Sequence, residues 1–301
     1  MFHNSKFVFF GTPEFASIIL EKLINAGFIP KAVICNPDKP VGRKKIITPP
    51  PVKQRIMNYE LGIRNKIKIL QPEKLDEKFY NSLFILHNSI DLFIVAAYAK
   101  IIPKEILEIP QLGIIGVHPS LLPKHRGASP IQTAILNGDE ITGVTLYLMD
   151  EKIDHGSILA QKTLENYELR IMNYETLSEK LAELGADLLI EFLRKYENEQ
   201  NYEKIIGAPQ DESQATYTKK IKTQDAFIEP QDLEKSINEG GEIAILIDRK
   251  VRAFNPEPGT WTLRQAQGKP KRMKILESIL TPEKKLKLKK IQFEGKKPIE
   301  I

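Results

Sequence analysis

The sequence predicts an α/β protein of two domains, in which a parallel sheet comes first and a small β-rich domain follows. Short apolar segments alternate with helical patterns up to residue 118, as in a parallel sheet covered by helices. The 301 residues exceed the size of a typical single domain. A polar, irregular stretch at 197–213 then separates the first part from a segment rich in turn residues.

Five short apolar segments predict the strands of the parallel sheet, because strands buried on both faces need no polar alternation. They lie at 6–10, 31–36, 67–70, 91–98 and 113–118. After the first of them, Pro13 fits the first turn of a helix and Thr12 is expected to cap that helix.

Two further strands and a long helix are expected after the parallel strands. The strands are predicted at 141–150 and 156–164, and a strongly amphipathic pattern predicts a helix over 175–196. Thr176 or Ser178 is expected to cap it.

The boundary between the two predicted domains is placed in the polar stretch. The first domain then covers 1–206 and the second covers 207–301. The second segment contains short alternating runs and turn residues, notably "FNPEPGTW" at 254–261, which are typical of a small β-rich domain.

The positive charge of the chain is concentrated in two runs. The formal net charge is +5 and the isoelectric point is about 9.0. One run lies at 37–45, and the other, at 263–297, carries about twelve Lys and Arg against three Glu. Such runs indicate a nucleic-acid partner, although a solvated, solubilising face remains an alternative.

Several classes of protein are not expected from this sequence. Cys35 is the single cysteine, so an internal disulfide is excluded, and the histidines lack metal-ligand spacing, so no metal is expected. The turn "GTPEFA" after the first strand lacks the Gly-x-Gly-x-x-Gly fingerprint, so NAD is not expected. Without a signal pattern or a membrane-length apolar run, the expected location is the cytoplasm, away from membranes.

His118 is the strongest candidate for chemistry, because it ends a predicted parallel strand. Ligands of open α/β sheets bind at the carboxyl ends of their strands. Asp154 follows in "DEKIDHGSI", and a carboxylate beside an imidazole orients it and raises its basicity for proton transfer. From spacing alone, a structural histidine and a turn aspartate remain the alternative interpretation.

Motifs in a fixed order along the chain resemble the 10-formyltetrahydrofolate-dependent formyltransferases, and among them the enzymes that act on methionyl-tRNA. They include "FFGTPEFA", "NPDKPVGRKK", "VAAYAKIIP", "SLLPKHRGASP", "GVTLYLMDEKIDHGSILAQ", "QDESQATYTKKI" and "RAFNPEPGTW". The resemblance implies a Rossmann-like first domain and an OB-like β-barrel at the C-terminus. That barrel is expected to be shortened, because about forty residues follow Trp261.

The resemblance also implies a reaction and a set of residues. The methionyl amine of charged initiator tRNA would attack the formyl carbon of 10-formyltetrahydrofolate, with His118 bonding the formyl oxygen and Asp154 helping to remove the amine proton. No metal or nicotinamide is required. The folate site would be lined by Ser120, Leu121, Leu122, Pro123 and the backbone around Ala97, Tyr98 and 150–154.

The basic loop at 36–51 resembles the segment that grips the acceptor end of tRNA in this family. Arg43, Lys44 and Lys45 are expected to meet phosphates there. Arg126 is expected to hold its loop structurally, and His125 and His155 are expected to face solvent. The chain is expected to act as a monomer.

Gly116 departs from the family pattern, which has an asparagine two residues before the histidine. Loss of such a hydrogen-bond donor costs about 10²- to 10³-fold in rate. A water could donate instead, the change could be a knock-out, or the chain could be a folate- or tRNA-binding pseudoenzyme. On the first account, Gly116→Asn is expected to raise the rate. Transfer to a small amine, on a sugar nucleotide or a ribonucleotide, is a further alternative that the basic loop disfavours.

Overall fold

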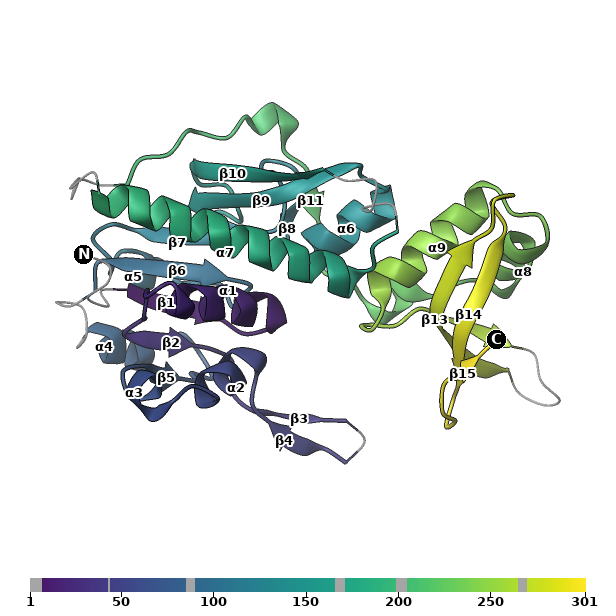
Figure 1. Cartoon of the computed structure of the whole chain (residues 1–301), viewed down its shortest axis with the longest axis horizontal. Coiled ribbons are helices and arrows are strands. Elements are labelled where there is room, and N and C mark those ends of the chain that lie inside the picture. The colour runs from purple at the N-terminus through teal and green to yellow at the C-terminus, as the bar shows by residue number, and fades with distance from the viewer. Residues whose placement is uncertain (1–6, 43, 85–89, 166–170, 199–204, 265–269) are drawn as a thin grey trace. The chain divides into compact units, whose positions relative to one another are not determined.

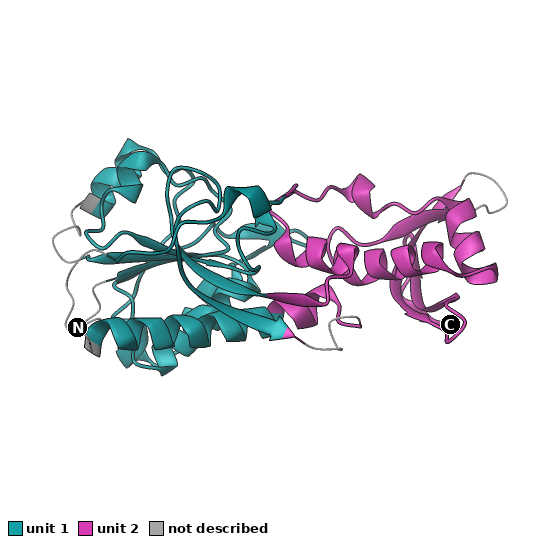
Figure 2. Ribbon diagram, turned by 90° about the horizontal axis from the view of Figure 1, so that it is seen from above, with its two compact units in different colours: residues 1–126, 143–164, 179–216 teal, residues 127–142, 165–178, 217–301 magenta. Residues whose placement is uncertain are grey.

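The computed structural model describes residues 7–42, 44–84, 90–165, 171–198, 205–264 and 270–301. The chain divides into two compact units, which Figure 2 shows in different colours. Unit 1 comprises residues 1–126, 143–164 and 179–216, and unit 2 comprises 127–142, 165–178 and 217–301. The chain therefore passes between the units several times, and a single boundary at residue 206 stays a prediction.

Unit 1 is built on a seven-stranded sheet with the order β10-β9-β7-β6-β1-β2-β5 (Figure 1). Its strands are β1 (Phe7–Gly11), β2 (Ala32–Ile34), β5 (Lys68–Leu70), β6 (Leu92–Ala96), β7 (Ile114–His118), β9 (Ile141–Leu148) and β10 (Ile158–Glu165). The first five pair in parallel, which confirms the predicted α/β sheet. Strand β9 runs antiparallel to β7, an orientation that its apolar run does not encode.

Helices cover both faces of this sheet (Figure 1). Helix α1 (Glu14–Asn25) and helix α7 (Tyr174–Asn198) share one face, where Lys22 and Asp187 form an ion pair of 2.7 Å. Gly185 of α7 allows close packing, because a Cβ there would lie 3.0 Å from Val117 of β7. The other helices of unit 1 are α2 (Pro51–Met57), α3 (Leu61–Arg64), α4 (Glu77–Phe84) and α5 (Lys104–Leu107).

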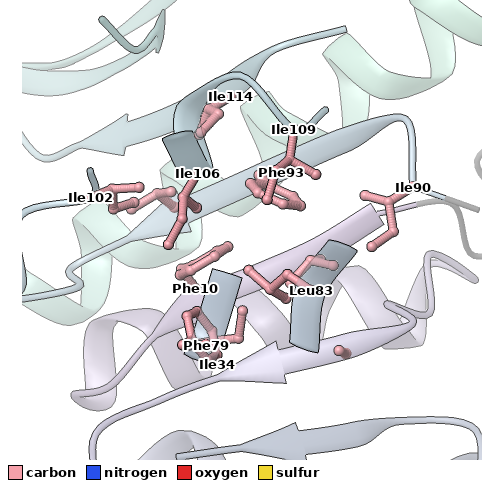
Figure 3. Packing of buried hydrophobic residues seen from close by; sticks show 13 residues of the cluster. Phe10, Ile34, Phe79, Leu83, Ile90, Phe93, Ile102, Ile106, Ile109 and Ile114 are labelled. Atoms are coloured by element: carbon pink, nitrogen blue, oxygen red, sulfur yellow. The ribbon is translucent and has the colours of Figure 1, made fainter. Parts of the chain in front are cut away.

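The opposite face of the sheet carries an apolar core under α4 and α5 (Figure 3). Phe10 of β1 and Phe93 of β6 meet there with ring centroids 5.2 Å apart. Side chains of a strand alternate between faces, so Val8 and Phe10 point to this core while their neighbours face the other helices. The core is completed by Ala32, Ile34, Phe79, Leu83, Ile90, Val95, Ile102, Ile106, Ile109 and Ile114.

Both predicted helix caps were wrong. Helix α1 starts after Pro13 without a side-chain cap, and the Thr12 hydroxyl instead accepts a hydrogen bond of 3.2 Å from the backbone N–H of Asn36. Helix α7 is capped by Asn173, whose side-chain oxygen accepts from the N–H of Thr176 at 2.9 Å. An asparagine in the residue before a helix satisfies the same exposed donors as Thr or Ser.

Unit 2 contains a four-stranded antiparallel sheet in the order β12-β13-β14-β15, as expected for a small β domain. Helices pack on it as well, and the sequence analysis did not anticipate them. The elements are α6 (Pro130–Asn137), α8 (Pro230–Asn238), α9 (Glu242–Phe254), β12 (Trp261–Arg264), β13 (Lys271–Leu280), β14 (Leu286–Phe293) and β15 (Ile299–Glu300). The short strands β8 (Arg126–Gly127) and β11 (Tyr217–Thr218) precede this sheet in the sequence.

Candidate active site

The carboxyl ends of three parallel strands meet at one edge of the unit 1 sheet. Strand β1 ends at Gly11, which is paired with Ala96 at the end of β6. Ala96 is paired in turn with Val117, next to His118 at the end of β7. His118 is therefore at the edge where α/β sheets bind ligands, and it is buried.

His118 and Asp154 lie side by side at this edge. The distance from His118 Nδ1 to Asp154 Oδ2 is 3.7 Å, and both side chains are largely buried. The other ring nitrogen, Nε2, lies 3.0 Å from the carbonyl oxygen of His125. A carbonyl can only accept, so Nε2 carries a proton and Nδ1 is the nitrogen that can exchange one. At 3.7 Å the pair is an ion pair when the imidazole is protonated, not a direct hydrogen bond.

Asp154 and two residues of the loops at this edge, His125 and Ala97, have left-handed backbone conformations. The φ angles are 49° at Asp154, 59° at His125 and 46° at Ala97. A left-handed conformation costs about 1–2 kcal/mol at a residue with a Cβ. Such outliers persist where the surrounding structure fixes them, commonly at functional sites. They support the assignment of this edge as the active site.

The loop that follows His118 is held from inside by hydrogen bonds. Thr145 of β9 donates through its hydroxyl to the carbonyl of Ser120 at 2.7 Å and accepts from the N–H of Leu122 at 3.0 Å. Ser120 and Leu122 are buried, and the Ser120 hydroxyl donates to a carbonyl within the loop. These two predicted folate residues therefore shape the loop, while Leu121 and Pro123 are half-buried.

Tyr98 carries a buried polar group at the end of β6. Within the described part of the chain, its hydroxyl has no hydrogen-bond partner. The ring packs edge-on against Phe10, with centroids 5.5 Å apart. Burial, and to a smaller extent Cys35, raises the pKa of Tyr98 to about 12, so the hydroxyl stays protonated. Tyr98 is therefore packed against the apolar core of unit 1 with its hydroxyl covered.

Arg126 is fully buried and links the loop to a later part of the chain. Its guanidinium donates to Gln210 Oε1 at 2.7 and 3.1 Å and to both carboxylate oxygens of Glu212 at 2.6 and 3.0 Å. Gln210 in turn donates to the carbonyls of Asp154 at 2.9 Å and Gly156 at 2.7 Å. These contacts agree with a structural role for Arg126. Gln210 was not among the predicted site residues, although it begins the motif "QDESQATYTKKI".

His155 does not simply face solvent, which corrects the expectation for this residue. Its Nδ1 lies 2.6 Å from Asp150 Oδ2, and its Nε2 lies 3.5 Å from Glu212 Oε1. The Arg126 hydrogen bonds hold the pKa of Glu212 below its ordinary value, and His155 contributes to the same direction. His125 is half-buried, and its backbone carbonyl accepts a hydrogen bond from His118 Nε2.

The ring of Tyr147 lies beside Gly116. The two residues are directly paired across β7 and β9. A Cβ on Gly116 would lie 2.3 Å from Cε1 of the Tyr147 ring, far inside van der Waals contact. The ring therefore lies across the glycine and fills the position at which a side chain of residue 116 would begin.

The basic loop forms a two-stranded hairpin of β3 (Lys39–Val41) and β4 (Ile46–Thr48), visible in Figure 1. Lys44 and Lys45 are exposed at its tip, whereas Arg43 lies outside the described residues. Large apolar side chains of the strands are exposed as well, namely Val41, Ile46 and Ile47. The hairpin thus presents apolar and positive groups together.

The base of this hairpin is firmly anchored. Lys53 Nζ lies 2.8 Å from Asp38 Oδ2 and 2.7 Å from Gln71 Oε1. Gln71 also donates to Asp38 at 2.7 Å and to the carbonyl of Asn36 at 2.8 Å. The hydrogen bond from Lys53 is the main cause that lowers the pKa of Asp38. Because these contacts fix the base of the hairpin, they help to determine where its exposed tip lies.

In the part of the chain that the structure describes, no three His, Cys, Asp or Glu side chains form a group that could hold a metal ion. Among the same residues, no helix is both long and apolar enough to cross a membrane.

Residues 5–193 match the family model described as formyl transferase. This match, together with the Rossmann-like sheet, defines the class of protein to which the chain belongs. Two solved structures agree with the fold. The methionyl-tRNA formyltransferase from Clostridium thermocellum has a TM-score of 0.58, with 16% identity over 98% of this chain and 99% of that chain.

The other solved structure is the N-formyltransferase from Helicobacter canadensis with folinic acid and dTDP-3-aminofucose. Its TM-score is 0.59, with 22% identity over 92% of this chain and 88% of that chain. Among curated proteins, the methionyl-tRNA formyltransferase of Caldicellulosiruptor saccharolyticus is 41% identical over 85% of this chain and 75% of its own length. The chain belongs to the methionyl-tRNA formyltransferase family. The sugar enzyme shows the fold alone and does not favour a small amine acceptor.

Proposed function

We propose that this chain transfers the formyl group of 10-formyltetrahydrofolate to the amino group of methionyl initiator tRNA. The observation that carries the proposal is the His118–Asp154 pair, at 3.7 Å, on the ligand-binding edge of the sheet. The relatives named methionyl-tRNA formyltransferase support the acceptor, and the folinic acid in the N-formyltransferase structure supports a folate-derived donor.

The reaction requires a proton to move between two nitrogens. The new C–N bond forms at the methionyl amine and the old one breaks at the folate nitrogen, so one nitrogen loses a proton and the other gains one. His118 can accept that proton at Nδ1, because Nε2 is committed to the carbonyl of His125. The Asp154 carboxylate then stabilises the imidazolium, and the same Nδ1 proton is available to the leaving nitrogen.

The surroundings of this pair fit a flat, polar ring such as a pterin. Ala97 is exposed at the end of β6, and the half-buried Leu121 and Pro123 add apolar side chains after His118. A mostly apolar wall with a few aimed polar groups is the usual character of a small-molecule site. When bound there, 10-formyltetrahydrofolate would supply the electrophilic formyl carbon.

The function is tested by incubating the purified chain with 10-formyltetrahydrofolate and methionyl initiator tRNA. Formylmethionyl-tRNA is expected as the product, followed on acid gels, while an amino-sugar nucleotide should not be formylated. Transfer to the sugar and not to the tRNA would replace the proposed acceptor. Binding of a folate analogue by calorimetry without any transfer would indicate a pseudoenzyme.

The hairpin tip is the proposed contact with tRNA phosphates. Replacing both Lys44 and Lys45 by alanine is expected to weaken tRNA binding and to leave the folate KM unchanged. Each lost phosphate contact should reduce the slope of log K against log salt by about 0.7 to 0.9. Filter binding over a salt series measures this slope.

A matched control is available on the same unit. Lys66 and Lys68 are also exposed, so Lys66→Ala with Lys68→Ala removes the same charge at another place. If this control reduces the slope as much as the hairpin variant does, tRNA contact is not located at the hairpin tip.

A further inference from the structure

We infer that Tyr147 is a positioning residue for formyl transfer, which holds the Asp154 carboxylate opposite His118, and that Gly116 is the glycine that admits its ring. The inference rests on the proposed function and adds to it a residue outside the His118–Asp154 pair. The Tyr147 hydroxyl donates a hydrogen bond of 2.7 Å to Asp154 Oδ1. The other carboxylate oxygen, Oδ2, faces His118.

The pairing of β7 with β9 places these groups on one face of the sheet. Gly116 is opposite Tyr147, and His118 is opposite Thr145. Residues two apart on a strand share a face, so Tyr147 is a diagonal neighbour of His118. The two rings are perpendicular, with an interplanar angle of 89° and centroids 6.4 Å apart.

Gly116 is required by this arrangement for a steric reason. Tyr147 is almost completely buried, and its ring lies where a Cβ at residue 116 would project. Three ring atoms would be within 3.0 Å of that Cβ. A buried aromatic ring cannot move aside as the end of a flexible side chain can, so a glycine here and a tyrosine opposite it form a matched pair.

The phenol acts as a donor to the carboxylate. Burial, and then the charge of Asp154, raises the pKa of Tyr147 well above its ordinary value, so its proton stays on the oxygen. Asp154 is thus held through its backbone and its side chain: its carbonyl accepts from Gln210, and its carboxylate accepts from Tyr147. With Oδ1 engaged, the rotamer that directs Oδ2 at His118 is fixed.

Tyr147→Phe removes the hydroxyl and keeps the ring that fills the space over Gly116. We expect kcat for formyl transfer to fall by about 10- to 100-fold, as for a misplaced catalytic group, with both KM values within about 2-fold of wild type. The control is Tyr59→Phe, which removes a hydroxyl bonded to Asn25 in the same unit, away from this edge. It should retain wild-type kcat.

A double-variant cycle separates positioning from general stabilisation. If Tyr147 acts through Asp154, adding Tyr147→Phe to Asp154→Asn should lower kcat by less than about 2-fold, because the two residues act as a unit. An additive further loss, or wild-type kcat in Tyr147→Phe alone, would overturn the inference and leave the proposed function intact.

A second readout needs no turnover. With ¹⁵N-labelled histidine, the ring resonances of His118 should change in Tyr147→Phe and stay unchanged in Tyr59→Phe. Unchanged His118 resonances in Tyr147→Phe contradict the inference whether or not the protein formylates tRNA. If the His118 resonances change in Tyr147→Phe and the wild-type protein forms no formylmethionyl-tRNA, the connection from Tyr147 to His118 is supported and the proposed function is rejected.

The glycine is tested separately. Gly116→Ala should displace the Tyr147 ring, lowering the Tm and reducing kcat at least as much as Tyr147→Phe does. Adding Tyr147→Leu should relieve the collision and recover most of the Tm, but kcat should stay low because the hydroxyl is absent. Recovery of kcat in that double variant would contradict a role for the hydroxyl. For the same steric reason, Gly116→Asn alone is now expected to slow the reaction.

Discussion

Replacing His118 by asparagine is expected to lower kcat for formyl transfer by about 10²- to 10⁴-fold, the usual contribution of a general acid–base residue. Asparagine is close in size to the imidazole, so the buried site should remain filled. Its amide has no ionisable nitrogen to take the amine proton that Nδ1 of His118 is placed to accept. Single-turnover formylation of methionyl-tRNA measures the loss directly, without a contribution from product release.

The pattern of kcat across the single and double variants is a more specific test than the size of the loss in His118→Asn. Asp154→Asn should also lower kcat, and the double variant with His118→Asn should be no slower than the slower single variant, because groups that act as a unit are not additive. Thermal unfolding shows whether each variant is folded. A folded His118→Asn protein with more than about a tenth of wild-type kcat would remove the imidazole from the proton transfer.

The edge of the sheet that carries the candidate site was predictable from local patterns. The apolar segment that ends at His118 predicts a buried parallel strand, and the end of such a strand is a ligand edge. Helix α9 was also encoded, since Ala244, Ile247 and Val251 are buried at helical spacing, but the turn residues around it favoured a β interpretation. Local patterns therefore predicted the parallel strands at their observed positions. The helical spacing in α9 was also a local pattern, but it did not lead to a predicted helix.

The partners of the site residues were not predictable, because they depend on which strands pair and in what register. Taken alone, Gly116 indicates only that the side chain expected at this position is absent. Only the antiparallel pairing of β7 with β9 shows that Tyr147 fills that place. In the same way, Gln210 reaches Asp154 from a segment 56 residues later, a contact that no local period encodes. A glycine in an active site is therefore best interpreted together with the residue opposite it.

Replacing Arg126 by alanine is expected to lower the free energy of unfolding by about 3 kcal/mol. The side chain is fully buried, so its loss leaves a cavity and deprives Gln210 Oε1 of its donor. The freed Glu212 carboxylate is half exposed and can be hydrated, so the cost is less than for a stranded buried charge. Arg126→Lys should recover little of the lost stability, because an ammonium group cannot reproduce the set of hydrogen bonds that the planar guanidinium donates to Gln210 and Glu212. Urea unfolding measures both variants.

Arg55→Ala is the matched control, because Arg55 also pairs with two carboxylates, on Glu14 and Glu21, but is about one-third exposed. Its loss should cost about 1 kcal/mol or less. Arg126→Ala should also change the response of the fold to acid. Arg126 lowers the pKa of Glu212, so this pair stabilises the fold above the ordinary carboxyl pKa and loses that effect as the pH falls through the lowered value.

Arg126→Ala should in addition slow the chemistry, which Arg55→Ala should not. Gln210 needs Arg126 to hold its oxygen so that its nitrogen points at the carbonyl of Asp154. Without that orientation the turn carrying Asp154, which has a left-handed φ of 49°, loses a restraint that offsets its strain. A variant with a lowered Tm and an unchanged kcat, measured where it is fully folded, would show that Tyr147 and the rest of the turn hold Asp154 without Arg126.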